Sequence, residues 1–469
     1  MTASSGAANH AANHGDDHPL ARLRFFVEAA RAAWSGDCER SQAQRTAVLA
    51  LAIRIVSAAI AYALQAILAR WMGSFEYGTF VFVWVWVLIL GGLAPLGLNV
   101  AAMRFIPEHR EKGETGLLRG FLFASRALTL GAATLMALAA ALVLWAYPSI
   151  LARHYLIPAY LALICLPLYA LADLNDCIGR AHSRILLALV PPFVLRPLLL
   201  LSAMVAARLL GLELTASTAV GAAIFATWLA AIVQIIGLRR HSDREIAAGR
   251  RSFNVRHWLT AALPIVLIEG FELLLQNTDI LVLSRYLPAD QVGVYFAALK
   301  TIGLVSFVHF AVGAAVANRI SALNARGDQV RLRRFVRDAA NWTFWPSLGG
   351  ALVILALGRP LLWIFGPDFT SAYPVMFVLA AGLVFRAAMG PAEFVLNMLG
   401  AQNACAAVLF FTAGLNLVLN FALIPSWGLL GAGFATAFSL AFAALAFYGV
   451  AKRRLGLDIS VWHSFARAD

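Results

Sequence analysis

Five basic residues stand inside long apolar stretches of this chain. They are Arg54, Arg126, Arg196, Lys300 and Arg386. A cation at the centre of a membrane helix costs about 2.5–3.5 kcal/mol, so such side chains normally face a bundle interior or a wet cavity. Arg binds phosphate through two parallel hydrogen bonds and Lys acts as a point charge, so the five cations predict a cavity for a phosphate-bearing substrate. Arg126 alone is near enough to a predicted helix end to reach the membrane surface instead.

Acidic residues form a stripe on one apolar stretch. Glu269, Glu272, Gln276 and Asp279 follow at i, i+3, i+7 and i+10, which places them on one face of a helix. Two interpretations fit this stripe. The acids neutralise cations on other helices, or they bind a proton or sodium ion that drives transport, because a buried carboxylate can be protonated near neutral pH or coordinate a hard cation.

Glu393 is a further candidate for ion coupling, on the same predicted helix face as Arg386. Two helical turns separate these side chains, so a direct pair within one continuous helix is not expected, and each is predicted to find a partner elsewhere. The sequence contains no P-loop, HExxH or GxSxG motif. We therefore expect no enzyme activity, no catalytic residue, no cofactor and no metal site.

The composition indicates what kind of protein carries these charges. Of the 469 residues, 61% are hydrophobic and 13% are charged, whereas soluble domains carry roughly 25% charge. Apolar stretches long enough to cross a bilayer recur along the whole chain. The net charge of +13 does not indicate nucleic acid, because the basic residues lie in alternate loops, which is a signal of membrane topology.

Twelve spans are predicted, at residues 47–69, 79–103, 120–146, 158–175, 187–207, 216–238, 259–283, 292–317, 341–358, 373–399, 405–424 and 429–450. Most of the 37 Lys and Arg residues lie in one alternating set of loops and in both tails, which are therefore predicted to be cytoplasmic. The expected organisation is a cytoplasmic tail with an interfacial helix (1–46), a six-helix bundle (47–238), a basic cytoplasmic linker (239–258), a second six-helix bundle (259–450) and a cytoplasmic tail (451–469).

A repeated motif relates the two halves. Arg70, Gly78 and Phe80 recur at one constant offset as Arg285, Gly293 and Tyr295. Six spans per half is an even number, so both halves enter the membrane from the same side and the repeats are predicted to be parallel. A duplicated apolar chain is typical of a carrier with its site between the halves.

Three segments resemble one family. Residues 416–436 contain paired asparagines, then Ile-Pro, then Gly-x-x-Gly-Ala; residues 293–300 read Gly-Val-Tyr-Phe-Ala-Ala-Leu-Lys; and residues 363–373 lead into a predicted span. With the twelve spans, they resemble the polysaccharide flippases of the multidrug/oligosaccharidyl-lipid/polysaccharide exporter superfamily. The resemblance implies an all-α integral membrane protein whose two six-helix bundles form a V with a central cavity.

The resemblance also implies a function. A flippase of the O-antigen or exopolysaccharide type would move a polyprenyl-diphosphate-linked oligosaccharide from the cytoplasmic to the periplasmic leaflet of a bacterial inner membrane by alternating access. The cavity cations would hold the diphosphate while the lipid tail stays among the membrane lipids. A polysaccharide polymerase and glycosyltransferases are further candidate partners, and no nucleic acid is expected.

Two other functions stay open. One is a cation-coupled multidrug exporter of the same superfamily, although the usual cationic drugs fit poorly in a cavity lined by cations. The other is a membrane scaffold that assembles glycosyltransferases without transport, in which the intramembrane charges only pair with one another. Neutralising single cavity cations in a protein that still folds distinguishes transport from the scaffold.

Overall fold

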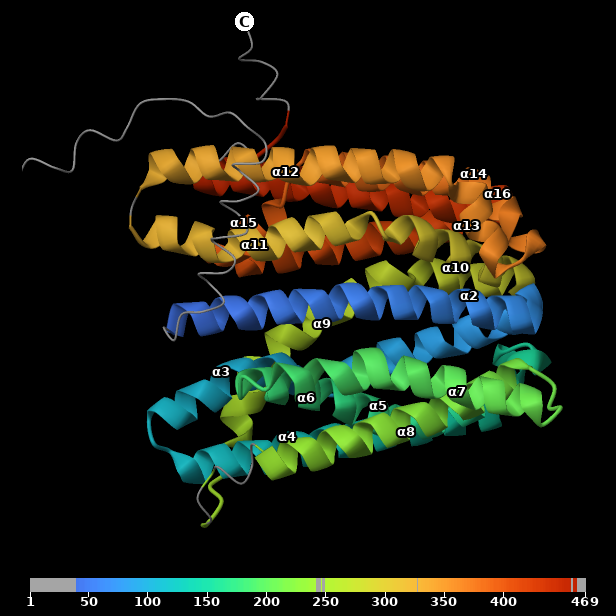
Figure 1. Ribbon diagram of the computed structural model, residues 1–469, viewed down its shortest axis with the longest axis horizontal. Helices are drawn as coiled ribbons and strands as arrows, with labels where there is room; N and C mark the ends of the chain where they lie inside the picture. The colour runs from blue at the N-terminus through green and yellow to red at the C-terminus, as the bar shows by residue number, and fades with distance from the viewer. Residues whose placement is uncertain (1–38, 242–245, 247–248, 327, 457–458, 462–469) are drawn as a thin grey trace, which may run out of the picture. The chain divides into compact units, whose positions relative to one another are not determined.

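The computed structural model describes residues 39–241, 246, 249–326, 328–456 and 459–461, and most of them are helical (Figure 1). Residues Met1–Ile55 and Val56–Asp469 form two compact units. In the first unit the described part is the beginning of α2, and most of the predicted N-terminal tail lies outside the described residues.

The helix content confirms an all-α multi-pass membrane protein. Among the described residues there is no strand. Eight helices are long and apolar enough to cross a membrane, or ten if each of two bent helix pairs counts as one span. The linker and tail boundaries expected from the charge pattern stay predictions.

The first half of the chain supplies the helices up to α8. They are α2 (Glu39–Leu93), α3 (Leu98–Glu111), α4 (Thr115–Ala146), η1 (Pro148–Ile150), α5 (Arg153–Ala181), α6 (Ile185–Val190), η2 (Pro191–Leu195), α7 (Arg196–Leu209) and α8 (Ala216–His241). α5 packs against α3, α4 and α8, so it is central to this group.

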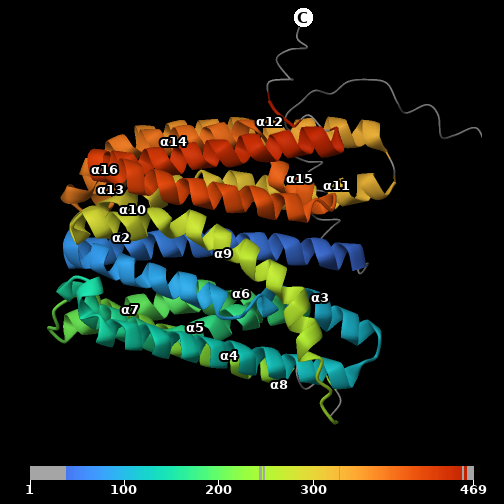
Figure 2. The ribbon, with the colours of Figure 1, turned by 180° about the vertical axis from the view of Figure 1, so that it is seen from behind.

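The second half begins with α9. Its helices are α9 (Val255–Tyr286), α10 (Ala289–Gly303), α11 (Ser306–Ala325), α12 (Gln329–Ala356), α13 (Gly358–Phe365), η4 (Pro367–Ala372), α14 (Tyr373–Ala388), α15 (Ala392–Met398) and α16 (Gln402–Leu455). α14 packs against α12 and α16, while α9 packs against both α16 and α3. Figure 2 shows α9 running from the neighbourhood of α3 towards α10. α9 therefore connects the helices of the two halves.

Two long helices bend sharply at glycine. α2 bends at Gly73 (φ 79°, ψ 169°) and α16 at Gly428 (φ 55°, ψ −129°), conformations that glycine adopts far more easily than other residues. Each bend falls between two predicted spans. The total of twelve spans, the parallel bundles, the V and the central cavity stay predictions.

Three spans predicted as continuous are broken, and these predictions were wrong. Span 79–103 is interrupted between α2 and α3, span 292–317 between α10 and α11, and span 373–399 between α14 and α15. Gly97 (φ 71°) and Gly390 (φ 67°) turn the chain at the first and third breaks. Hydrophobicity does not reveal such breaks, because the chain stays apolar on both sides of them.

The equivalent glycines of the two repeats pack against each other. A Cβ added to Gly78 would lie 1.7 Å from the carbonyl oxygen of Ala289 and 2.8 Å from the backbone nitrogen of Gly293, and a Cβ on Gly293 would lie 2.7 Å from the carbonyl oxygen of Ser74. α2 and α10 thus cross with their backbones in contact, which requires residues without a side chain. We call this contact of Gly78 with Gly293 the glycine crossing.

Candidate functional site

The first turns of α9 belong structurally to the first half of the chain. Trp258 is fully buried and packs edge-on against Phe121, with ring centroids 5.2 Å apart. Ala262 lies so close to the start of α3 that a Cβ on Gly97 would stand 2.5 Å from its carbonyl oxygen. The last turns of α9 instead contact the second half, where the ring centroids of Tyr286 and Phe421 lie 6.3 Å apart and the Tyr295 hydroxyl donates to Asp279 at 2.8 Å. The middle of α9, which carries the acidic stripe, therefore lies where the helix passes from one half to the other.

The segment before α9 is tied to α4. The Ser252 backbone N–H donates to the Gly116 carbonyl oxygen at 2.9 Å, and the Arg119 guanidinium donates to the Arg250 carbonyl oxygen at 3.0 Å. A Cβ on Gly120 would lie 1.8 Å from the Ser252 carbonyl oxygen, so this segment packs directly on the helix backbone. These contacts hold the entry to α9 against the first half.

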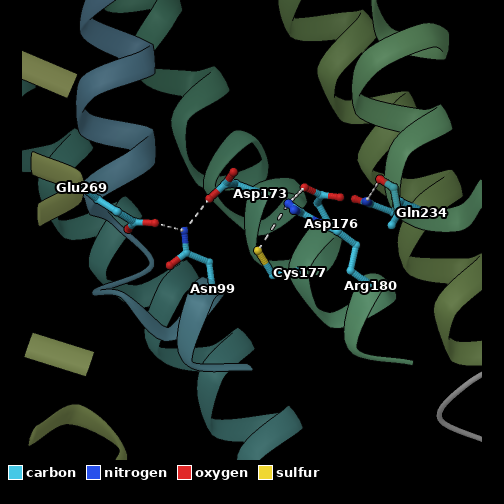
Figure 3. A network of polar contacts seen from close by, with 8 residues as sticks. Asn99, Asp173, Asp176, Cys177, Arg180, Gln234 and Glu269 are labelled. Atoms are coloured by element: carbon cyan, nitrogen blue, oxygen red, sulfur yellow. Dashed lines mark hydrogen bonds and ion pairs between the residues drawn. The ribbon is translucent and has the colours of Figure 1, made fainter. Parts of the chain in front are cut away.

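One amide joins carboxyl groups from both halves. Asn99 Nδ2 donates to Asp173 Oδ2 at 3.0 Å and to Glu269 Oε1 at 3.2 Å. These side chains come from α3, α5 and α9, and Figure 3 shows the Asn99 amide between the two carboxyl groups. Asn99 reaches this place because α3 begins immediately after the turn at Gly97. We call these three residues the amide bridge.

The amide bridge borders an acidic cavity of about 180 Å³, lined by Gly92, Asn99, Asp173, Glu269, Glu272, Leu273 and Gln276. The lining contains three carboxyl and two amide groups but no Arg or Lys. Such a set of oxygen atoms suits a proton or a small cation rather than a phosphate. Within the part of the chain that is described, no group of three or more His, Cys, Asp or Glu side chains is placed to hold a metal ion.

The acidic stripe divides into two environments. Glu269, Glu272 and Gln276 line the acidic cavity. Asp279, one turn further along α9, is buried and accepts hydrogen bonds from the Tyr295 hydroxyl at 2.8 Å and from the Ile280 backbone N–H at 2.9 Å. Asp279 thus binds a partner in the second half and does not line the cavity.

Arg386 and Glu393 pair directly, contrary to the sequence-based expectation. Arg386 Nη2 lies 3.3 Å from Glu393 Oε2. The prediction assumed one continuous helix, but the turn at Gly390 between α14 and α15 brings the two side chains together. Both groups also act electrostatically on Glu272, so this pair lies close to that residue of the acidic stripe.

The predicted cations occupy separate places. Arg54 lies in the first compact unit and is exposed there. Arg126 is half-buried, and its Nε donates to Asn175 Oδ1 at 3.2 Å, so its head group is directed at α5. Arg196 lies 5.1 Å from the ring centroid of Tyr169, and Lys300 lies 4.8 Å from that of Phe296.

Arg196 and Lys300 come from different halves, but the aromatic ring beneath each of them packs against α2. The ring of Tyr169 packs edge-on against Trp84, and the ring of Phe296 against Tyr77. Both Trp84 and Tyr77 belong to the part of α2 that follows the bend at Gly73. Within the described residues neither cation makes an ion pair, although Lys300 interacts electrostatically with Asp279 and Arg196 with Asp173.

The sequence-based reasoning missed Asn99 and Asp173. Asp173 is a lone acid inside the predicted span 158–175, which is the same signal as that of the intramembrane cations. Asn99 follows the run Ala-Pro-Leu-Gly at residues 94–97, and a Pro and a Gly this close together mark a turn. These two signals were present, although neither reveals that the residues meet Glu269.

Two curated proteins align with the chain over a limited segment. An uncharacterized membrane protein of Methanocaldococcus jannaschii is 26% identical over 188 residues, which cover 39% of this chain and 37% of that protein. The probable low-salt glycan biosynthesis flippase Agl15 of Haloferax volcanii is 24% identical over 164 residues, which cover 35% of each. The chain thus matches about a third of the length of these relatives.

Solved structures resemble the fold over most of the chain. An inward-facing multidrug resistance MATE family transporter of the MOP superfamily gives a TM-score of 0.72 at 13% identity, covering 88% of this chain and 96% of that one. The lipid II flippase MurJ, in an inward closed conformation, gives 0.66 at 14% identity, covering 86% and 87%. At these identities the likeness establishes the fold alone.

Two family models match the sequence. The MatE model matches residues 264–422, and the polysaccharide biosynthesis protein model matches residues 43–321. The resemblance inferred from the residues themselves is thereby confirmed. The polysaccharide biosynthesis protein model matches more than half of the length of this chain. The chain therefore belongs to the polysaccharide biosynthesis protein family.

Proposed function

We propose that this protein is a flippase that moves a polyprenyl-diphosphate-linked oligosaccharide from the cytoplasmic to the periplasmic leaflet of a bacterial inner membrane. The observation that carries the proposal is the match to the polysaccharide biosynthesis protein family over residues 43–321, in a chain whose fold resembles transporters almost from end to end. In this proposal both termini are cytoplasmic, and the product is used for a surface polysaccharide.

Arg196 and Lys300 are the strongest candidates for binding the diphosphate. Both lie on aromatic rings and make no ion pair among the described residues, so a phosphate does not have to displace an acid. The rings beneath them pack against the same part of α2, which places one cation from each half near that segment. Arg386 is a weaker candidate, because Glu393 already neutralises it. Arg54 and Arg126 remain candidates on residue type.

Glu269 and Glu272 are the candidates for coupling transport to an ion gradient. They line the acidic cavity at the place where α9 passes between the halves. A ligand shifts a conformational equilibrium only through its different affinity for the two states, and a site built from both halves provides such a difference. Asp279 and Glu393 are secondary candidates, because each is already bound to a partner in the second half.

A second function has one observation in its favour. The acidic cavity suits a cation, and the MatE model matches residues 264–422. A cation-coupled multidrug exporter would therefore place a cationic drug against Glu269 and Glu272. The two functions assign the same cavity to different ligands, so transport of a cationic dye and of a lipid-linked glycan distinguishes them.

The test uses purified protein in liposomes that contain a fluorescent polyprenyl-diphosphate-linked oligosaccharide. Flipping is followed by the access of an added, membrane-impermeant glycosidase to the sugar. We expect flipping by the wild type, a loss of at least about tenfold in Arg196→Ala and in Lys300→Ala, and partial recovery in Arg196→Lys, because each cation interacts with the diphosphate, which carries two negative charges in total.

The matched control is Arg208→Ala. Arg208 also lies on an aromatic ring, 5.0 Å from the ring centroid of Trp71, but it is in the last turn of α7 rather than in its first. Flipping in this variant should stay near the wild-type rate. Unchanged flipping in the Arg196 and Lys300 variants would refute the assignment of these cations. Export of a cationic dye without any glycan flipping would replace the flippase with the multidrug exporter.

A further inference from the structure

The amide bridge leaves two buried acceptors without a donor. Asn99 is 5% exposed, and its amide nitrogen donates to both Asp173 and Glu269. Its amide oxygen is buried and has no hydrogen-bond partner, and the same holds for Glu269 Oε2. Buried polar atoms are almost always hydrogen-bonded in folded proteins. The contact between the two halves therefore lacks a hydrogen-bond donor for these two oxygen atoms.

A proton on the Glu269 carboxyl group would supply the missing hydrogen-bond donor. An ionised carboxylate only accepts hydrogen bonds, whereas a protonated one also donates. With a proton on Oε2, Glu269 can donate to the Asn99 amide oxygen while Oε1 accepts from the Asn99 nitrogen, which is the cyclic pairing of a carboxylic acid with an amide. Figure 3 shows the Asn99 oxygen on the side of Glu269.

The charges around the bridge favour the same state. The titratable and charged groups that interact with Asp173 or Glu269 are Glu272 on α9, Tyr169, Asp176, Cys177 and Arg180 on α5, and Arg196 on α7. Arg180 pairs with Asp176, and Arg196 lies over an aromatic ring. Within the described residues none of Asp173, Glu269 and Glu272 makes an ion pair. Neutralising one of these three acids by a proton relieves the repulsion among them.

We propose that Asn99, Asp173 and Glu269 form a proton-binding site that is complete only when α9 lies against α3 and α5. Proton binding then stabilises the contact between the halves, and loss of the proton weakens it. Coupling is reciprocal, so separation of the halves must also lower the affinity for the proton. This inference rests on the proposed function for its use in transport, but the site itself requires only the contact.

The experiment measures the distance between the halves, not transport, so the two proposals can fail independently. Spin labels are attached to cysteines at position 186 on α6 and position 330 on α12, where Leu186 is 55% and Val330 is 76% exposed. Cys38 is replaced by serine, and the other three cysteines are buried. Distance distributions are recorded in liposomes at a series of pH values from about 5 to 8.

In the wild type we expect the population with the halves in contact to rise as the pH falls. Glu269→Gln carries a permanent amide donor, so its distribution should stay in the contact state at every pH. Asn99→Leu removes the bridge, so its contact population should stay low at every pH. Glu272→Gln is the matched control from the same cavity. It should keep the response and move its midpoint to lower pH, because a negative neighbour of Glu269 is gone.

Two results would overturn the proposal. One is a pH response in Glu269→Gln that matches the wild type. The other is a wild-type distribution that responds to sodium at constant pH and not to protons, which would make this a sodium site. If Glu269→Gln fails to fold, infrared difference spectra of the wild type and Asn99→Leu decide the matter. The C=O stretch of a protonated carboxyl group must be present in the wild type and weakened in the variant, and its absence from the wild type would refute the site.

Discussion

The two halves of this protein meet in two contrasting places, the glycine crossing and the amide bridge. At the glycine crossing the backbones of α2 and α10 touch, and the neighbouring Tyr77 and Tyr295 are fully buried. At the amide bridge, side chains of Asn99, Asp173 and Glu269 meet beside a cavity of about 180 Å³. The first contact depends on shape alone, and the second depends on charge and protons.

The difference indicates how each contact can respond. A close-packed backbone contact has no room for an alternative arrangement, because even one added methyl group would overlap with it. A polar contact beside a cavity can break and be replaced by water, at an energy that depends on protonation. We therefore expect the glycine crossing to persist in all states and the amide bridge to form and break.

Gly78→Ala should have the largest effect. Its new Cβ would lie 1.7 Å from a backbone oxygen, which no side-chain movement can relieve. Overpacking typically costs about 1–3 kcal/mol and occasionally more, and we expect this variant at or above the upper end. The measurement is SDS-induced unfolding of purified protein. Gly131→Ala in α4 is the control, because nothing lies within 4 Å of its added Cβ. Equal stability of the two variants would contradict a close backbone crossing.

Asn99→Leu should have the next largest effect. It leaves both Asp173 and Glu269 without their shared donor, and each buried unsatisfied group costs about 1–3 kcal/mol, so two such costs exceed the loss of a single hydrogen bond. The loss of stability should be greater at pH 5 than at pH 8, because the protonated bridge that the variant lacks stabilises the wild type only when the proton is bound. Gln276→Leu lines the same cavity outside the bridge, so it should cost less and show no such pH dependence. A pH-independent loss in Asn99→Leu would argue against a titrating bridge.

The contrast between the contacts also explains what the sequence could and could not predict. The duplicated motif predicts that Gly78 and Gly293 occupy equivalent positions, and this equivalence is visible because both copies keep the same spacing. That the two glycines touch each other is a tertiary fact, and equivalence alone does not imply it. The apolar spans likewise predict the helices, since burial in lipid requires continuous hydrophobic residues.

The acidic site was predictable only in part. The spacing of Glu269 and Glu272 on α9 indicates one helix face, and both residues do line the cavity. Their partners come from α3 and α5, and no local pattern encodes which helices α9 will touch. The pairing of Arg386 with Glu393 was misjudged for a local reason: the Gly-Pro sequence at residues 390–391 marks a break that hydrophobicity conceals.

Tyr295→Phe tests the closely packed region around the glycine crossing without changing any backbone. The Tyr295 hydroxyl donates to buried Asp279 at 2.8 Å, and hydrogen bonds to charged groups contribute about 1.5–3 kcal/mol. We expect a loss of stability in this range by SDS-induced unfolding. If Asp279→Asn is combined with Tyr295→Phe, the loss should be smaller than the sum of the two single effects, and additivity would show that the two side chains are not coupled.

Tyr77→Phe should have the smallest effect of the four. Tyr77 is as deeply buried as Tyr295 and stands next to Gly78, but its hydroxyl donates to the neutral Gln65 at 2.9 Å. A neutral hydrogen bond contributes about 0.5–1.5 kcal/mol, roughly half of one to a charged acceptor. The ratio between the two tyrosine variants is the informative quantity, because both remove one hydroxyl from the same closely packed region. A larger loss in Tyr77→Phe than in Tyr295→Phe would mean that Asp279 carries no charge in the folded protein, so that the polar chemistry of α9 extends beyond the amide bridge.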